Sequence, residues 1–176
     1  MKQVIHNIIL KFAISVISRR GAMSGVYMYL SSRDSRHLFP TNRLNDFIVE
    51  FDQEIQLLNC QSSRLSQKLS VALTEISICP TGSFRTRTGL PESCVVLCDI
   101  CDLTYIKGTR LPILRVLTSP LEEISGSLFQ PYYIETNAVS FKRLHFQIIA
   151  RDLIPLNAAK WNFESEVRCT VHFAIL

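Results

Sequence analysis

The 176-residue chain is poor in the residues that form catalytic turns and phosphate loops. It has six glycines and one tryptophan, and no G-x-S-x-G, H-E-x-x-H or glycine-rich phosphate loop occurs in it. Its 19 Lys and Arg residues are scattered, with a formal net charge of +4. Proteins that bind nucleic acid concentrate such residues on one stripe. We therefore expect no catalytic site, no bound cofactor or metal, and no specific binding to nucleic acid.

An apolar run long enough to cross a membrane is also missing. Residues 4–17 are apolar but contain a lysine and an asparagine, and they fall short of the roughly 20 residues that a span requires. A signal peptide would end in small residues, and here two arginines stand in their place. Three interpretations stay open: an amphipathic arm that contacts a partner or a membrane surface, a poor signal peptide, or an extension upstream of a start at Met23. We expect residues 1–25 to form an arm or extension outside a single domain at residues 26–176.

The six cysteines show no disulfide or metal pattern. Most lie within or beside apolar segments, where Cys behaves as a small hydrophobe, so we expect free thiols in a reducing compartment. Cys98 and Cys101 form a C-x-x-C pair, which can serve a zinc site or a redox dithiol. No second pair exists for zinc, and a strand running through both would point them to opposite faces. The sequence therefore predicts buried or edge thiols.

Histidines and acidic residues give no catalytic constellation. His37, His145 and His172 are far apart in sequence, and the chain has no H-x-H pair of the kind that a cupin-like metal site uses. We expect His145 and His172 to be sheet residues that face solvent or a neighbour. Asp99 and Asp102 flank cysteines at the end of an expected strand and have no obvious basic partner.

From residue 26 onward, β-prone segments alternate with turn-forming residues. Residues 47–51 and 141–150 alternate apolar and polar side chains, the period of a half-buried strand. Strands joined by loops of ten or more residues do not suit a meander, and the Cys-Trp-Cys spacing of an immunoglobulin domain is absent. The pattern predicts an all-β single jelly roll, with eight antiparallel strands in two packed sheets. We expect these strands at residues 26–30, 47–51, 69–78, 94–100, 111–117, 130–134, 141–150 and 167–175.

Several short motifs occur in a characteristic order along this β region. After Y-L-S-S at residues 29–32, the chain reads F-P-T-N-R-L-N-D-F-I-V at 39–49, V-A-L-T-E-I at 71–76, G-T-R-L-P-I-L-R-V at 108–116, F-Q-P-Y-Y at 129–133 and V-R-C-T-V-H-F at 167–173. Together they resemble the minor capsid (penton) proteins of Polinton/Maverick elements and the related adintoviruses. The resemblance covers roughly residues 26–174. The chain departs from the family after the last motif, where a basic residue is common and Ala174 stands instead.

The resemblance implies a structural protein and not an enzyme. The family's fold is a single jelly roll, and five copies would close an icosahedral vertex among double-jelly-roll major capsid proteins, in a virion assembled inside the host cell. A cyclic pentamer brings two different surfaces of each subunit together, and exposed apolar, Arg and Tyr residues suit such contacts. The candidate subunit contacts are Arg110, Arg115, Tyr132 and Tyr133. The two tyrosines could instead cover a sheet end. We expect the loop at residues 40–45 to be structural and to direct the chain into the next strand.

Two other functions stay open at this point. A jelly-roll binding module, lectin-like or cytokine-like, would favour secretion, paired cysteines and a working signal peptide. A cupin-like enzyme would require bound metal in stoichiometric amount.

Overall fold

A computed structural model of the chain describes residues 15–16, 25–33, 36, 38–43, 45–56, 69–79, 93–118, 125–127, 130–138, 140–153 and 166–175. These residues form β-strands and turns and contain no α-helix, so the expected all-β class is confirmed. Within the same ranges, no helix is long and apolar enough to cross a membrane. His37, Cys60 and most of the apolar segment at residues 4–17 lie outside the described residues.

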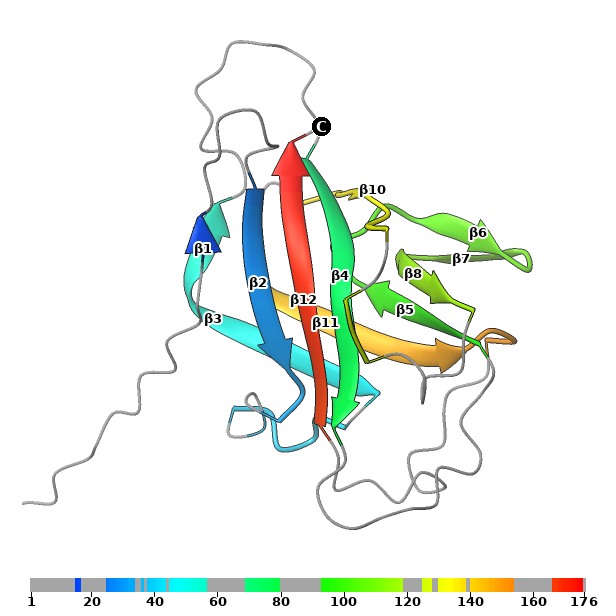
Figure 1. Cartoon of the computed structure of the whole chain (residues 1–176), viewed down its shortest axis with the longest axis horizontal. Coiled ribbons are helices and arrows are strands. Elements are labelled where there is room, and N and C mark those ends of the chain that lie inside the picture. The colour runs from blue at the N-terminus through cyan, green and yellow to red at the C-terminus, as the bar shows by residue number, and fades with distance from the viewer. Residues whose placement is uncertain are drawn as a thin grey trace, which may run out of the picture.

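The strands form two antiparallel sheets and a hairpin. The six-stranded sheet has the order β1 (Ser15–Val16), β2 (Gly25–Ser31), β12 (Glu166–Ile175), β4 (Leu69–Cys79), β10 (Ile134–Glu135), and β9 (Ser125–Ser127) also pairs with β4. The four-stranded sheet has the order β3 (Asp46–Gln56), β11 (Ser140–Ala150), β5 (Cys94–Cys98), β8 (Ile113–Leu117). The hairpin joins β6 (Thr104–Ile106) to β7 (Thr109–Leu111). In Figure 1 the larger sheet stands in front, and β3 and β11 run across behind it.

One apolar core lies between the two sheets. On β11, Leu144, Phe146 and Ile148 are buried in this core, and His145 alternates with them on the other face, as the period of the sequence predicted. Across the gap, the ring of Phe141 stacks on that of Phe173 from β12, with 5.4 Å between centroids. Each such buried side chain contributes roughly 1.5–3 kcal/mol to folding, so this interior is a major source of the domain's stability.

Several predicted strand bounds were wrong, for local reasons. Residues 111–117 are broken at Pro112, which cannot donate a backbone hydrogen bond, into β7 and β8. The strand expected at residues 94–100 ends at Cys98, because the backbone amide of Cys101 donates a hydrogen bond to the carbonyl of Cys98 at 3.0 Å and the chain turns there. The strand expected at 130–134 is reduced to β10, Ile134–Glu135. The prediction also missed β1, β6 and β9, and β1 extends the larger sheet from within the expected N-terminal arm.

The four-stranded sheet has β3 and β8 as its outer strands, and no other described strand pairs with their outer edges. Asn42 closes part of the β3 edge. Its side-chain amide donates to the carbonyl of Ile48 at 2.8 Å, and its side-chain oxygen accepts from the Ile48 amide at 3.0 Å. The loop at residues 40–45 therefore folds back on β3 in the way a neighbouring strand would, which fits the structural role expected for it.

Candidate functional site

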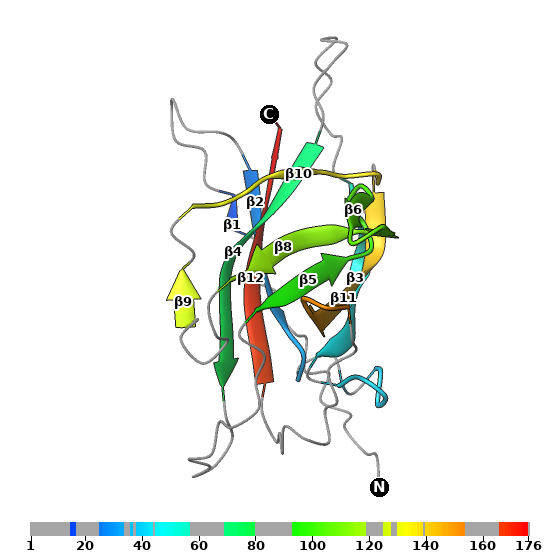
Figure 2. The same cartoon turned by 90° about the vertical axis from the view of Figure 1, so that its right-hand side faces the viewer.

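A groove of about 490 Å³ opens beside β8, at the edge of the four-stranded sheet. Its walls come from the β6–β7 hairpin, from β8, and from the chain that leads into β10. Figure 2 looks onto this end of the molecule and shows β5 and β8 in front, with β10 crossing above β8. The lining includes Tyr105, Ile106, Ile113, Arg115, Tyr132 and Ile134.

Large apolar side chains lie open to solvent around this groove. Tyr105 is 70% exposed and Tyr132 is 64% exposed, and Leu103 and Val116 nearby are also exposed. Single exposed apolar residues are common on protein surfaces, but several gathered around one concave site are typical of binding surfaces and make this groove the candidate site. Tyr side chains suit such a role because they combine a large apolar ring with a polar tip.

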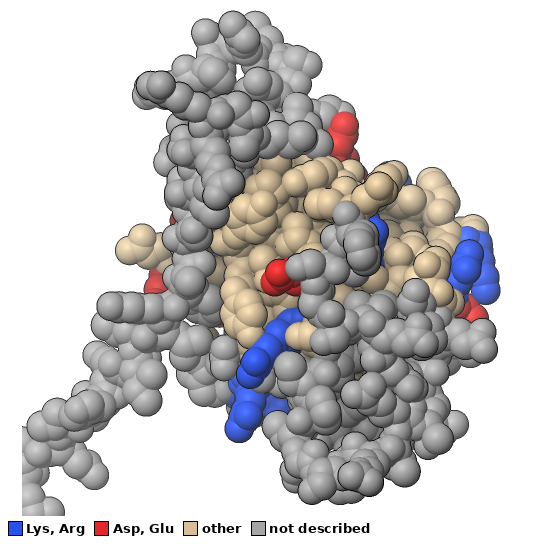
Figure 3. All heavy atoms as spheres, in the orientation of Figure 1, with Lys and Arg blue, Asp and Glu red and all other residues tan. Residues whose placement is uncertain are grey.

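Positive charge accompanies these aromatic rings. The guanidinium of Arg110 lies 5.8 Å from the centroid of the Tyr105 ring, within the range of a cation–π contact. Arg115 projects from β8 into the groove lining. Among the described residues, neither arginine forms an ion pair with a carboxylate. Figure 3 shows a small group of Lys and Arg atoms, with acidic atoms beside it, at the right-hand end of the molecule, where the β6–β7 hairpin lies in Figure 1; a larger basic group lies at the lower left. The groove therefore offers apolar and cationic surface together.

Tyr133 turns away from the groove and covers the outer face of the larger sheet. Its hydroxyl lies 2.6 Å from Nδ1 of His172 on β12, and the Tyr27 ring stacks on the same imidazole with 4.0 Å between centroids. His172 is only 4% exposed, so the expectation that it faces solvent or a neighbour was wrong. Burial lowers the pKa of His172, and burial followed by the nearby Tyr27 raises the pKa of Tyr133. Both groups are thus favoured in their neutral forms.

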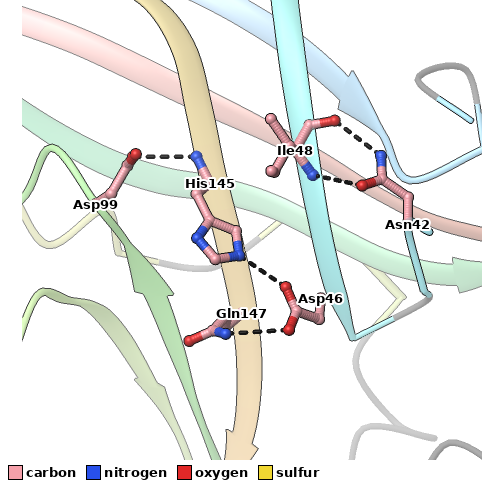
Figure 4. Close-up of polar contacts among 6 residues, drawn as sticks. All are labelled: Asn42, Asp46, Ile48, Asp99, His145 and Gln147. Atoms are coloured by element: carbon pink, nitrogen blue, oxygen red, sulfur yellow. Dashed lines mark hydrogen bonds and ion pairs between the residues drawn. The ribbon is translucent and has the colours of Figure 1, made fainter. Parts of the chain in front are cut away.

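His145 belongs to a polar cluster on the outer face of the four-stranded sheet (Figure 4). Its Nε2 lies 2.7 Å from a carboxylate oxygen of Asp46, and the other oxygen of Asp46 accepts a bond from Gln147 at 3.1 Å. Asp99 accepts a hydrogen bond from the His145 backbone amide at 3.0 Å. These contacts join β3, β11 and the turn after β5. Within the described ranges, no group of three or more His, Cys, Asp or Glu side chains could hold a metal ion.

The C-x-x-C cysteines lie in the core. Because the chain turns after Cys98, the prediction of opposite faces does not apply, and both Cys98 and Cys101 belong to the same core cluster. Burial raises the pKa of the Cys98 thiol well above its ordinary value, and the adjacent Cys101 side chain raises it further. Burial also raises the pKa of Cys94 and of Cys169 to about 12. Thiols held in the protonated form are poor nucleophiles and metal ligands.

Three of the four candidate contact residues thus meet at one place: Arg115 and Tyr132 line the groove, and Arg110 stacks on its wall. Sequence reasoning missed Tyr105 and the hairpin that carries it. The sequence signal for this hairpin was the Lys107-Gly108 pair, because glycine favours a tight turn. In the structure both residues have positive φ (47° and 78°), as the tightest two-residue hairpin turns require. Comparisons with protein-family models, with curated proteins and with solved structures found no match for this chain.

Proposed function

We propose that the described strands form a single jelly roll. In that fold the chain behaves as one long hairpin whose paired arms are wrapped into two sheets. Nested antiparallel pairings support this assignment: β2 with β12, β3 with β11, β4 with both β9 and β10, and β5 with β8. The further pairings of β12 with β4 and of β11 with β5 join these pairs side by side.

The function we propose is that of a shell subunit, the minor capsid (penton) protein that forms pentameric vertices. The observation that carries this proposal is the groove beside β8, where exposed Tyr105 and Tyr132 accompany two arginines that have no described ionic partner. Cyclic assemblies use such surfaces, because each copy must meet its two neighbours through different patches. The proposal includes what the resemblance in the sequence implies. Five copies would stand among double-jelly-roll major capsid proteins, in a virion assembled inside the host cell.

The native mass of the purified full-length chain tests the proposal. Size-exclusion chromatography with light scattering should give five times the 20.1 kDa of one copy, and negative-stain images should show rings. A trimer would favour the cytokine-like alternative. A monomer at every concentration tested would refute a role in shell assembly that depends on this chain alone.

Charge reversal in the groove tests whether it is a subunit contact. Arg110→Glu with Arg115→Glu should convert the pentamer to a monomer, because the change opposes a partner matched to positive charge. Arg151→Glu is the matched control, since Arg151 is exposed outside the groove. Unchanged far-ultraviolet circular dichroism would show that both variants are folded. Normal pentamers of the double variant would exclude the groove as a contact.

A further inference from the structure

The two outer strands of the four-stranded sheet carry opposite charge. On β3, the consecutive residues Asp52, Gln53 and Glu54 are all exposed. At the other end of the sheet, Arg115 lies on β8 and Arg110 lies on the adjoining hairpin. In Figure 1, β3 runs across behind the larger sheet to the left side of the molecule, and β8 lies on the right. Lys142 and Arg143 on the neighbouring strand β11 form ion pairs with Glu50 of β3, at 3.4 and 3.0 Å. The segment of β3 at residues 52–54 is acidic, and the groove end of the sheet carries two arginines.

Among the described residues, Asn42 closes one part of the β3 edge and leaves the rest without a neighbouring strand. Its side chain occupies both backbone groups of Ile48, so another strand cannot pair there. The acidic residues come after this closed point in the chain, where β3 and β11 also lose their regular register. An irregular, charged edge resists indiscriminate strand pairing and still can bind a surface of matched charge.

We propose that the acidic segment of β3, residues 52–54, docks in the groove beside β8 of a second copy of this chain. This inference rests on the proposed function and names the contact through which copies assemble. The carboxylates of Asp52 and Glu54 would meet Arg110 and Arg115, and the exposed rings of Tyr105 and Tyr132 would pack along the incoming strand. Each copy then uses one edge to reach the copy before it and the other edge to reach the copy after it. Such head-to-tail contacts close into a ring when the rotation between copies allows it.

Charge also disfavours the symmetric alternative, in which two grooves face each other. A twofold contact would bring the arginines of one copy towards the arginines of the other, and like charges in an interface oppose association. Two acidic edges would repel in the same way. Contact between unlike edges instead brings the carboxylates of one copy towards the arginines of the next.

Reversal of the acidic edge is the direct test. Asp52→Lys with Glu54→Lys should weaken self-association at least about tenfold, the change that roughly 1.4 kcal/mol of lost binding energy produces. Because Glu54 accepts a hydrogen bond from Ser140 at 2.6 Å, Asp52→Lys alone is measured beside it and should weaken association in the same direction. Asp152→Lys, at an exposed position outside both edges, is the control and should leave assembly unchanged.

Mixing the variants distinguishes this contact from a general effect of charge. The groove variant (R110E/R115E) keeps its acidic edge, and the edge variant (D52K/E54K) keeps its groove. Each should be monomeric alone, and an equimolar mixture should associate with 1:1 stoichiometry by light scattering. A mixture of folded variants that stays monomeric would overturn the inference. If the wild type and the edge variant both form pentamers, the inference is overturned and the proposed function stays intact. If the wild type itself is monomeric, both the inference and the proposed function fail.

Discussion

Replacing Asn42 by alanine should destabilise the domain, because this one side chain closes the β3 edge at Ile48. Two hydrogen bonds of 2.8 and 3.0 Å would be lost. Each such bond contributes about 0.5–1.5 kcal/mol net, so the free energy of unfolding should fall by about 1–3 kcal/mol. For a domain of this size, a loss of 1 kcal/mol lowers Tm by about 2–4 °C. Urea unfolding followed by circular dichroism gives the free-energy change directly.

A matched control is available next to it in the chain. Thr41 is exposed, and Thr41→Ala should change stability by no more than about 0.5 kcal/mol. Hydrogen exchange adds a local readout: the Ile48 amide should exchange faster in the Asn42→Ala variant, since its acceptor is gone. If Asn42→Ala matches Thr41→Ala in stability and the Ile48 amide stays protected, the side chain does not hold this edge and the reasoning fails.

Three further predictions concern the interior. Burial lowers the folded-state pKa of His172, so the folded state binds fewer protons than the unfolded state, and stability should decline as pH falls below about 6.5. The difference in unfolding free energy between wild type and His172→Gln, measured at pH 7.5 and at pH 5.5, should therefore change with pH. Equal differences at the two pH values would contradict this. Cys94 and Cys169, with pKa values raised to about 12, should resist alkylation by iodoacetamide at pH 8 until urea unfolds the chain. Labelling of these two residues in the native protein at the rate of a free thiol would contradict their burial. Phe146 is 1% exposed and its ring lies 5.5 Å from that of Phe47, so Phe146→Ala should cost about 3–5 kcal/mol in urea unfolding, and a loss below about 1 kcal/mol would place it outside the core.

Sequence alone predicted β4, β11 and β12 nearly in full because their pattern is local, whereas for β3 it predicted only residues 47–51 of Asp46–Gln56. In β11 and β12, apolar residues recur at every second position, so the buried face can be assigned before any partner is known. The shorter elements depend on single residues that interrupt a run. Pro112 divides one predicted strand in two, and the turn after Cys98 shortens another. Such interruptions can be predicted from the sequence only by asking, for each residue, whether its backbone can make the hydrogen bonds of a strand.

The candidate site was less accessible to sequence reasoning, because its residues converge through the fold. Arg115 and Tyr132 meet only when the chain before β10 crosses over β8. The burial of His172 depends on Tyr133, which lies 39 positions earlier in the chain. Alternation indicates which face of a strand a residue occupies, and it cannot indicate whether a distant segment will cover that face. The prediction for His172 failed for this reason.

The nested strand pairs also constrain how the chain can fold. β12 lies between β2 and β4 in the larger sheet, yet it follows all the other described strands in the chain. The central ladders of that sheet therefore cannot form until synthesis has passed residue 175, and β2 must wait with an unpaired edge for more than a hundred residues. Contacts of such long sequence separation fold slowly and leave strands open to wrong partners. Yield of folded protein should then depend on temperature and on chaperones during synthesis more than the stability of the finished domain would suggest.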